Sequence, residues 1–234
     1  MKRIAIIPAR GGSKRIPKKN IKAFHGKPII AYSIEAAIQS NLFDEIMVST
    51  DSEEIASVAE MYGAKVPFLR SKQNADDYAT TFDVIKEVVG TYQKYGVEFE
   101  YVCCIYATAP FVDEKRLINA FDLLLKNNFD CVFPVIPYSF PIQRSIKIEN
   151  NQNKMELVYP EHELSRSQDL GVRYHDAGQF YWMNLQQVVS KGKLWTDNSG
   201  VQIISELEGQ DVDNEIDWKL AELKYQLLRE KNII

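Results

Sequence analysis

The chain has 234 residues, 45% of them apolar, which suits one domain with a sizeable core and excludes a disordered or fibrous protein. Its most apolar runs, such as residues 4–7, are far shorter than the roughly 20 residues of a membrane-spanning helix. The net charge is −4, yet residues 1–34 hold nine Lys and Arg and no acid. This asymmetry predicts a local anion site in an acidic protein, rather than the broad basic face of a nucleic-acid-binding module.

Short apolar strands and amphipathic helices alternate along residues 2–135. We expect strands at residues 2–7, 45–49, 66–69, 101–105 and 131–135. Helices are expected to begin near Pro28, after Ser52, at Thr81 and after Asp113. Strands that alternate with helices predict an α/β fold, with a doubly wound and mostly parallel sheet.

The alternation breaks after Pro137. Two strand-like runs, residues 142–149 and 155–159, flank an Asn-rich turn at 150–153 and predict a β-hairpin arm. We expect one domain over residues 1–234, with residues 138–170 as the inserted arm; the pattern alone fits a decorative insertion as well as a contact with a partner. Strands at 179–183 and 201–204 and a helix at 215–230 complete the expected elements.

The start of the chain and its cysteines bear on location. Met1–Arg3 begins like a signal peptide, but Pro8, Arg10 and Lys14 interrupt the apolar stretch that such a peptide needs, so we expect a cytoplasmic protein. The three cysteines lie in apolar runs, and no histidine pattern nearby favours a catalytic thiol over reduced core residues. They are Cys103, Cys104 and Cys131.

The loop after the first strand, residues 8–20, is the most informative segment. Ligands of open parallel sheets bind beyond the carboxyl ends of the strands, which is where this loop lies. Paired glycines let backbone amides approach a phosphate closely, while a hydroxyl and several cations supply further donors. The loop therefore predicts a polyphosphate site made by Arg10, Gly11, Gly12, Ser13, Lys14 and Lys19.

Two better-known phosphate motifs are missing from this loop. It has neither the Gly-x-x-x-x-Gly-Lys-Ser/Thr of P-loops nor the Gly-x-Gly-x-x-Gly of dinucleotide sites. A solvated charged loop is the alternative, but five cations between Arg10 and Lys19 without a counter-charge favour an anionic ligand.

Asp211 and Asp213 point the same way on an extended segment, as a hard cation between phosphates requires. We therefore predict Mg²⁺ at these two carboxylates. Asp213 could instead, or in addition, cap the last helix. The three histidines, His25, His162 and His175, lack the paired spacing of a zinc site.

Four segments together resemble the CMP-sialic acid synthetase family, over nearly the whole chain. They are Ile7–Asn20 (Ile-Pro-Ala-Arg-Gly-Gly-Ser-Lys-Arg-Ile-Pro-x-Lys-Asn), Val48–Asp51, Tyr106–Pro110 and Gln210–Asp213. Within the family, Arg166–Leu170 and Tyr174–Trp182 look like the pseudaminic acid cytidylyltransferase branch. The neuraminic acid branch has Arg-Pro-Asn-Gly where this chain has residues 175–178, and Gln in place of Tyr106, which indicates a different sugar.

The resemblance implies a Rossmann-like nucleotidyltransferase fold and a CTP site. Arg10, Ser13, Lys14, Lys19 and Asn20 would hold the nucleotide, with Lys19 nearest the transferred phosphoryl group. Arg70 and the segment Asp77–Thr81, which includes Thr80 and Thr81, would frame cytidine and triphosphate. The residues alone are silent on how cytosine is selected, because backbone carbonyls can read its amino group.

An acidic sugar offers a carboxylate and hydroxyls, which suit Arg and His donors. With the resemblance, this assigns the sugar to Tyr106, Arg166, Gln168, His175, Asp176 and Gln179. His175 could instead be a structural histidine. The family is typically dimeric, so the resemblance also implies an arm that packs on a partner and completes the sugar site.

The expected reaction is attack of the sugar's anomeric hydroxyl on the α-phosphorus of CTP, which gives a CMP-sugar and pyrophosphate. Lys19, Arg10 and Asp211 are the predicted catalytic residues, with Mg²⁺ as cofactor. Pseudaminic acid is the expected substrate, with flagellin glycosylation as its use; neuraminic, legionaminic and 3-deoxy-octulosonic acid are the alternatives. A catalytically inactive CTP sensor is the alternative from another class.

Overall fold

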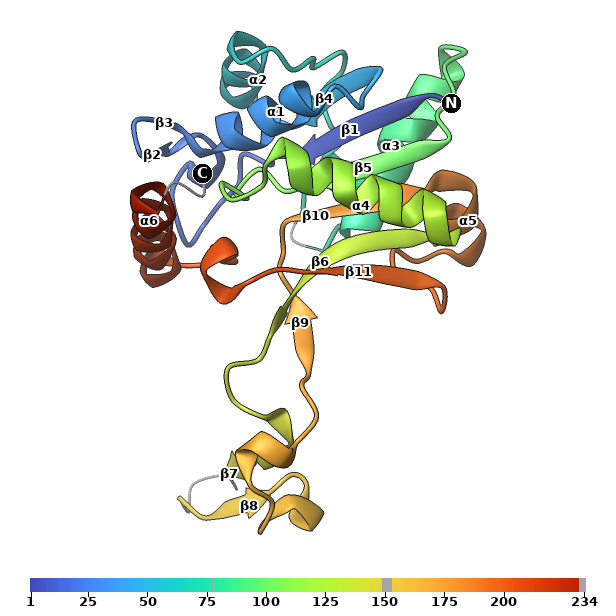
Figure 1. Ribbon diagram of the computed structural model, residues 1–234. Helices are drawn as coiled ribbons and strands as arrows, with labels where there is room; N and C mark the ends of the chain where they lie inside the picture. Colours follow the sequence, from blue (N-terminus) through green and yellow to red (C-terminus); the bar gives the residue numbers. More distant parts are fainter. Residues whose placement is uncertain (77, 149–152, 232–234) are drawn as a thin grey trace.

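The computed structural model describes residues 1–76, 78–148 and 153–231. Its centre is a seven-stranded sheet of order β11-β6-β10-β5-β1-β4, with β9 paired to β6 (Figure 1). The strands are β1 Arg3–Pro8, β4 Glu45–Ser49, β5 Tyr101–Ile105, β6 Cys131–Pro137, β9 Tyr174–Asp176, β10 Phe180–Asn184 and β11 Ser199–Ile203.

Helices cover both faces of the sheet, as expected of a doubly wound fold. They are α1 Ile29–Ser40, α2 Glu53–Met61, α3 Thr81–Lys94, α4 Glu114–Asn127, α5 Leu185–Lys191 and α6 Glu215–Glu230. Alternate residues of β1 belong to different cores: Ala5 and Ile7 pack with α1, α2 and α4, whereas Ile4 and Ile6 pack with α3 and α5. Because all four are fully buried, each isoleucine contributes about 1.5–3 kcal/mol by the usual transfer scale.

The directions of the strands bring the segments that follow β1, β4, β5 and β11 to one edge of the sheet. β5, β1 and β4 are parallel neighbours, so their carboxyl ends lie side by side. β10 is antiparallel between β5 and β6, and therefore its first residue, Phe180, lies opposite the last residue of β5, Ile105. β11 is parallel to β6, so the segment that follows it reaches the same edge.

Two expectations about the elements need correction. Residues 66–69 are not a strand; only Lys65 makes a bridge, to Met47 of the edge strand β4. Pro67 lacks the N–H that would extend the ladder. The short helix α5 was not expected, although Asn184 caps it and Gly192, with φ +67°, ends it.

A third core anchors the loop after β1. Two-residue strands β2 (Ala23–Phe24) and β3 (Lys27–Pro28) fold its end into a small hairpin. Phe24 packs edge to face on Trp218 of α6, with 5.6 Å between ring centroids, and fully buried Ile16 belongs to the same core. Ile16 and Phe24 therefore anchor the charged loop and the small hairpin that follows it to the C-terminal helix.

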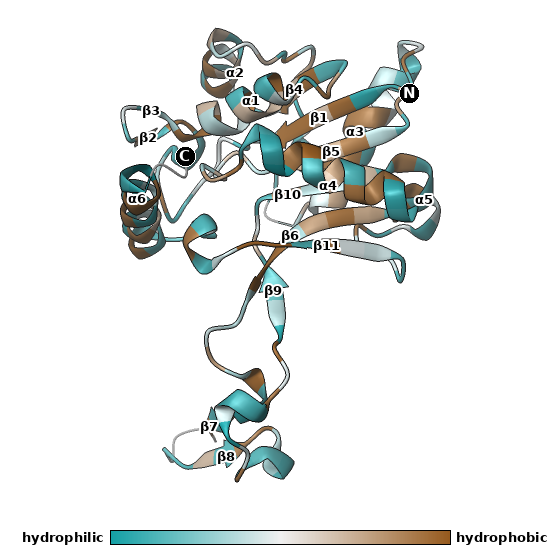
Figure 2. Cartoon of the chain, in the orientation of Figure 1, coloured by the Kyte–Doolittle hydropathy of each residue, from teal (hydrophilic) through white to brown (hydrophobic). Residues whose placement is uncertain are grey.

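The segment between β6 and β9 extends away from the sheet (Figure 1). Near its far end, β7 (Ile146–Ile148) pairs antiparallel with β8 (Met155–Leu157), so both strands are shorter than expected. Residues 150–152 of the predicted turn lie outside the described residues. Apolar residues recur among polar ones along this arm (Figure 2).

The three cysteines are fully buried and unpaired, which confirms their place in the core; burial raises the pKa of Cys104 to about 12. Across the residues that the structure describes, no helix combines the length and apolar character needed to cross a bilayer.

Candidate active site

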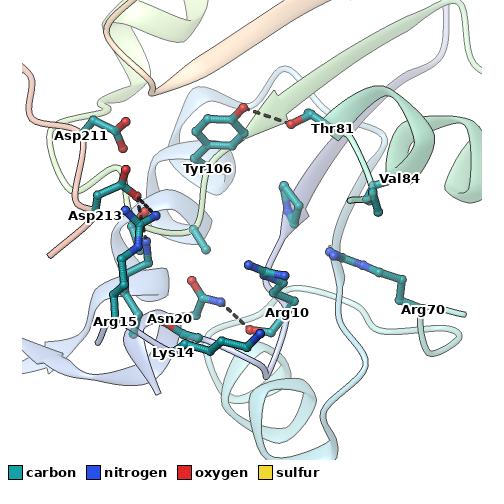
Figure 3. Close-up of a pocket in the computed structure, with 16 residues that line it drawn as sticks. Arg10, Lys14, Arg15, Asn20, Arg70, Thr81, Val84, Tyr106, Asp211 and Asp213 are labelled. Carbon is teal, nitrogen blue, oxygen red and sulfur yellow. Dashed lines mark hydrogen bonds and ion pairs between the residues drawn. The ribbon is translucent and has the colours of Figure 1, made fainter. Parts of the chain in front are cut away.

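A cavity of about 550 Å³ opens at the carboxyl edge of β1, β4 and β5 (Figure 3). Five basic and two acidic side chains face it, so it is positive in an otherwise acidic protein. It is lined by Pro8, Arg10, Ser13, Lys14, Arg15, Lys19, Asn20, Arg70, Ala79, Thr81, Val84, Tyr106, Ala107, Thr108, Asp211 and Asp213.

Internal hydrogen bonds hold the loop after β1 in shape. Buried Asn20 donates from Nδ2 to the carbonyl oxygen of Arg10 at 2.9 Å, and Ser13 Oγ donates to the carbonyl oxygen of Ile16 at 2.7 Å. These bonds close the loop on itself around Ile16. Its long cationic side chains are then left to line the cavity.

The paired glycines have a different place from the one expected. The amide of Gly11 donates to Asp51 Oδ1 at 2.8 Å, and a Cβ at Gly11 would lie 3.1 Å from Ser52 Cβ. Gly11 is therefore needed for close packing against the start of α2. A Cβ at Gly12 would meet open space, and neither glycine is among the residues that line the cavity.

Lys19 is held in place by the segment that follows β11. Its Nζ donates to the carbonyl oxygen of Val212 at 2.6 Å and lies 4.0 Å from Asp213 Oδ1. Burial lowers its pKa, although Asp213 and Asp211 oppose that shift. The ammonium group is thus fixed at the junction of the loop and the Asp211–Asp213 segment.

Two arginines reach the cavity from the sheet side. Arg70 is buried and donates to Ser49, from Nε to Oγ at 3.0 Å and from the guanidinium to the carbonyl oxygen. Burial lowers the pKa of Arg70, against the attraction of Asp51. Arg10 donates to the carbonyl oxygen of Asp76 at 3.0 Å. These bonds hold the two guanidinium groups in place before any ligand arrives.

Asp211 and Asp213 both face the cavity from the segment after β11 (Figure 3). Asp213 accepts from Arg15 at 2.9 Å. Desolvation, and then the charge of Asp213, raise the pKa of Asp211. Asp213 was also considered as the cap of the last helix. Its neighbour Asn214 caps α6 instead, by accepting from the amides of Ile216 and Asp217.

Asp211 and Asp213 fit Mg²⁺ only if other groups complete its coordination shell. Within residues 1–76, 78–148 and 153–231, three or more His, Cys, Asp or Glu side chains do not gather into a metal cage. Mg²⁺ usually takes one or two carboxylates and completes its shell with water and substrate phosphates. The donor set therefore suits a cation shared with a polyphosphate in this cavity.

A second, more open cavity of about 760 Å³ shares Thr81 and Tyr106 with the first. Asp176 lines it as well, so two of the predicted sugar residues, Tyr106 and Asp176, meet here. Thr80 also lines it, but its hydroxyl is occupied in the capping box of α3 with Asp83. Asp77 lies outside the described residues.

The other four predicted sugar residues are not brought to these cavities. Arg166 and Gln168 are exposed on the arm, where Arg166 pairs with Asp169 at 2.7 Å. His175 is exposed on β9, its ring 4.9 Å from that of Tyr138. Gln179 is buried and donates to the carbonyl oxygen of Glu208 at 2.6 Å, which makes it a brace between segments.

Two site residues escaped the prediction. Arg15 lines the cavity and pairs with Asp213, and Asp51 holds Gly11. Arg15 belongs to the cationic run that signalled the loop, so its charge was a usable signal. Asp51 shows its role only once β4 is placed beside β1.

The fold and this cavity define a doubly wound α/β protein with a positively charged cavity, suited to a polyphosphate, at the carboxyl edge of its sheet. A family model described as cytidylyltransferase matches residues 4–211, and the chain belongs to that family. The chain is 40% identical to a pseudaminic acid cytidylyltransferase of Campylobacter jejuni over 98% of this chain and 99% of that protein. It is 34% identical to a CMP-N,N'-diacetyllegionaminic acid synthase of Legionella pneumophila, covering 98% and 99%.

Among solved structures, the chain is similar to a CMP:2-keto-3-deoxy-manno-octonic acid synthetase complexed with CTP. The TM-score is 0.67 with 17% identity, over 98% of this chain and 100% of that chain. At this identity the likeness concerns the fold, and it confirms the expected nucleotidyltransferase architecture of the sheet.

Proposed function

We propose that this chain transfers CMP from CTP to the anomeric hydroxyl of pseudaminic acid and releases pyrophosphate. The observation that carries the proposal is the cavity in which Lys19, Arg10 and Arg70 face Asp211 and Asp213. The relative at 40% identity is named pseudaminic acid cytidylyltransferase, and the similarity covers 99% of its length. This relative supports the choice of nucleotide and sugar.

The residues of the cavity would work by positioning and charge neutralisation. Lys19, fixed by Val212, and Arg10, fixed by Asp76, offer cationic donors to the phosphates without having to reorganise. Asp211 and Asp213 would hold Mg²⁺, which supplies further neutralisation of phosphate charge.

We also propose that the chain forms a single domain in which residues 138–170 are an inserted arm. This arm would pack on a second copy of the chain. Its exposed apolar side chains are unusual for a surface in water. They are Tyr138, Phe140, Ile146, Ile148, Met155, Val158, Tyr159 and Leu164. Arg166 and Gln168, remote from the cavities of their own chain, would reach a sugar site only from such a partner.

The reaction is tested by incubating the protein with CTP, Mg²⁺ and one acidic sugar at a time while pyrophosphate release is followed. Release with pseudaminic acid is expected. Preferred release with neuraminic, legionaminic or 3-deoxy-octulosonic acid would assign a different sugar. CTP binding without release for any sugar would show a nucleotide sensor instead.

The setting of the reaction is also part of the proposal. The buried, unpaired cysteines suit a reducing compartment, and we infer a cytoplasmic enzyme. A relative from Campylobacter coli, 30% identical over 98% of this chain and named post-translational flagellin modification protein B, supports the glycosylation of flagellin as the use of the product. Fractionation of the producing cell tests the first point, and loss of flagellin glycan on deletion of the gene tests the second.

A further inference from the structure

The segment that carries Asp211 has little regular structure of its own. Residues 209–213 belong to neither a helix nor a strand, although they lie between β11 and α6. Such a backbone is fixed by the groups that contact it, because no ladder or helical hydrogen bonds hold it. The position of the Asp211 carboxylate therefore depends on the neighbouring segments.

Two neighbours hold this segment from different sides. Lys19 Nζ donates to the carbonyl oxygen of Val212, as described above. On the other side lies the turn between β9 and β10, where Gln179 Nε2 donates to the carbonyl oxygen of Glu208 at 2.6 Å. The carbonyl oxygen of Gln179 accepts from the amide of Tyr106 at 2.8 Å, so the turn is itself fixed to the end of β5.

Gly178 of the same turn contacts Asp211 directly. It has a φ of +62°, a left-handed conformation that suits glycine, and its amide donates to Asp176 Oδ1 at 2.9 Å. A Cβ on Gly178 would lie 3.5 Å from Asp211 Cγ and 3.7 Å from its Oδ1. These are van der Waals distances, so the space beside the Asp211 carboxylate admits one carbon atom at residue 178 and nothing longer in that direction.

Gln179 is better suited to bracing this segment than to binding a sugar. It is 1% exposed, and its Oε1 has no hydrogen-bond partner in the part of the chain that the structure describes. A buried acceptor without a partner costs stability. The benefit of an amide at this position therefore lies in its other atom, Nε2, and in the bond to Glu208.

We propose that Gly178 and Gln179 are positioning residues for Asp211, so that the turn between β9 and β10 sets the affinity of the nucleotide site for its divalent cation. This inference rests on the proposed function, which assigns Mg²⁺ to Asp211 and Asp213. Neither Gly178 nor Gln179 lines the first cavity, so both act through the carboxylate. The turn begins after Asp176, which lines the second cavity, and it therefore borders the cation site and the acceptor cavity alike.

The test measures cation binding without turnover. Mg²⁺ is titrated by calorimetry into the protein saturated with CTP, without sugar, and CTP alone is the blank. Gln179→Met keeps an unbranched side chain but removes the donor and the unmatched acceptor together, while the carbonyl oxygen of Glu208 keeps its bond from Arg116 at 3.3 Å. The Mg²⁺ dissociation constant should rise about tenfold, the lower end of what outer partners of metal ligands contribute, with little change in melting temperature.

Gln143→Met is the matched control. Gln143 is also buried, its Nε2 also donates to a backbone carbonyl oxygen, that of Gly171 at 2.9 Å, and its Oε1 likewise has no partner among the described residues. It lies in the arm, away from residues 209–213. The Mg²⁺ dissociation constant of this variant should equal that of the wild type.

Gly178→Asn tests the contact with the carboxylate. Asn adopts a positive φ more readily than most residues, and its side chain is longer than the single carbon atom that fits beside Asp211. The Mg²⁺ dissociation constant should again rise about tenfold. Gly96→Asn is the control for backbone strain, because Gly96 has a φ of +75° and a Cβ there would meet open space.

The outcomes separate this inference from the proposed function. A Gln179→Met variant that binds Mg²⁺ no more weakly than Gln143→Met, or a Gly178→Asn variant that matches Gly96→Asn, would overturn the inference. Asp211→Asn is measured in the same titration. If it binds Mg²⁺ like the wild type, the proposed cation site is wrong; if it binds weakly while both turn variants are unaffected, only the positioning role is refuted.

Discussion

The loop at residues 10–20 and the arm at residues 138–170 solve opposite problems. The loop is rich in charge, yet its Ile16 and Asn20 side chains are buried, and Asn20 donates to the carbonyl oxygen of Arg10 within the loop. The arm carries large apolar side chains, yet Phe140 is 83% and Leu164 94% exposed. The comparison teaches that residues distant in the sequence of one chain meet around the cavity, whereas the arm leaves large apolar side chains exposed.

The largest effect is expected in the loop. Lys19→Ala should lower kcat about 10²- to 10³-fold, as the loss of one fixed donor to a developing charge does. Lys22→Ala is the control, because Lys22 lies two residues after the loop and pairs with Glu215 outside the cavity. Equal activities of the two variants in the pyrophosphate assay would remove Lys19 from the chemistry.

The next effect concerns the cation. Loss of even an outer partner of a metal ligand costs about 10- to 100-fold in affinity, so Asp211→Asn should raise the Mg²⁺ concentration for half-maximal rate at least as much. A titration with Mg²⁺ at saturating CTP measures it. Asp122→Asn, an exposed substitution on α4, should titrate like the wild type. An unchanged titration for Asp211→Asn would place the cation elsewhere.

The sequence predicts well which residues line the first cavity and poorly which residues reach the second, for a physical reason. Lys19 and Asp211 line the first cavity as expected, because cation runs and alternating acids signal an ionic site locally. Arg166 and Gln168 carry equally polar side chains, but the arm takes them away from their own cavity, and a pattern within one chain does not show where a partner lies. The strand expected at residues 66–69 failed similarly, because apolar content outweighed the missing N–H of Pro67.

The arm side of the comparison is tested by Phe140→Asp with Leu164→Asp. Two carboxylates in an apolar interface should cost about 2 kcal/mol or more, roughly 30-fold in the dimer dissociation constant. Sedimentation measures the mass, and CTP binding should persist in the monomer. Met61→Asp, at an 80% exposed residue of α2, should not change the mass. A wild type that sediments as a monomer contradicts the assigned role of the arm.

The smallest effect is a shift in pH dependence. Burial lowers the pKa of Lys19 from its ordinary 10.5, so its charge is lost as the pH rises through that lowered value. In kcat/KM for CTP, which reports the free enzyme, the rate should fall on the alkaline side. Lys19→Arg keeps its charge and should move this fall to higher pH. Superimposable profiles would show that another group titrates.

The contact between Arg15 and Asp213 joins residues that are 198 positions apart in the sequence. It can therefore form only near the end of protein synthesis. At about 5–20 residues per second, the ribosome needs about 10–40 s after it adds Arg15 before Asp213 exists. During that time the cationic loop has been made but its acidic counterpart has not. A chain halted after β11 would therefore display an unbalanced positive loop to every polyanion nearby, and only the last stretch of translation converts that general attraction into a selective pocket.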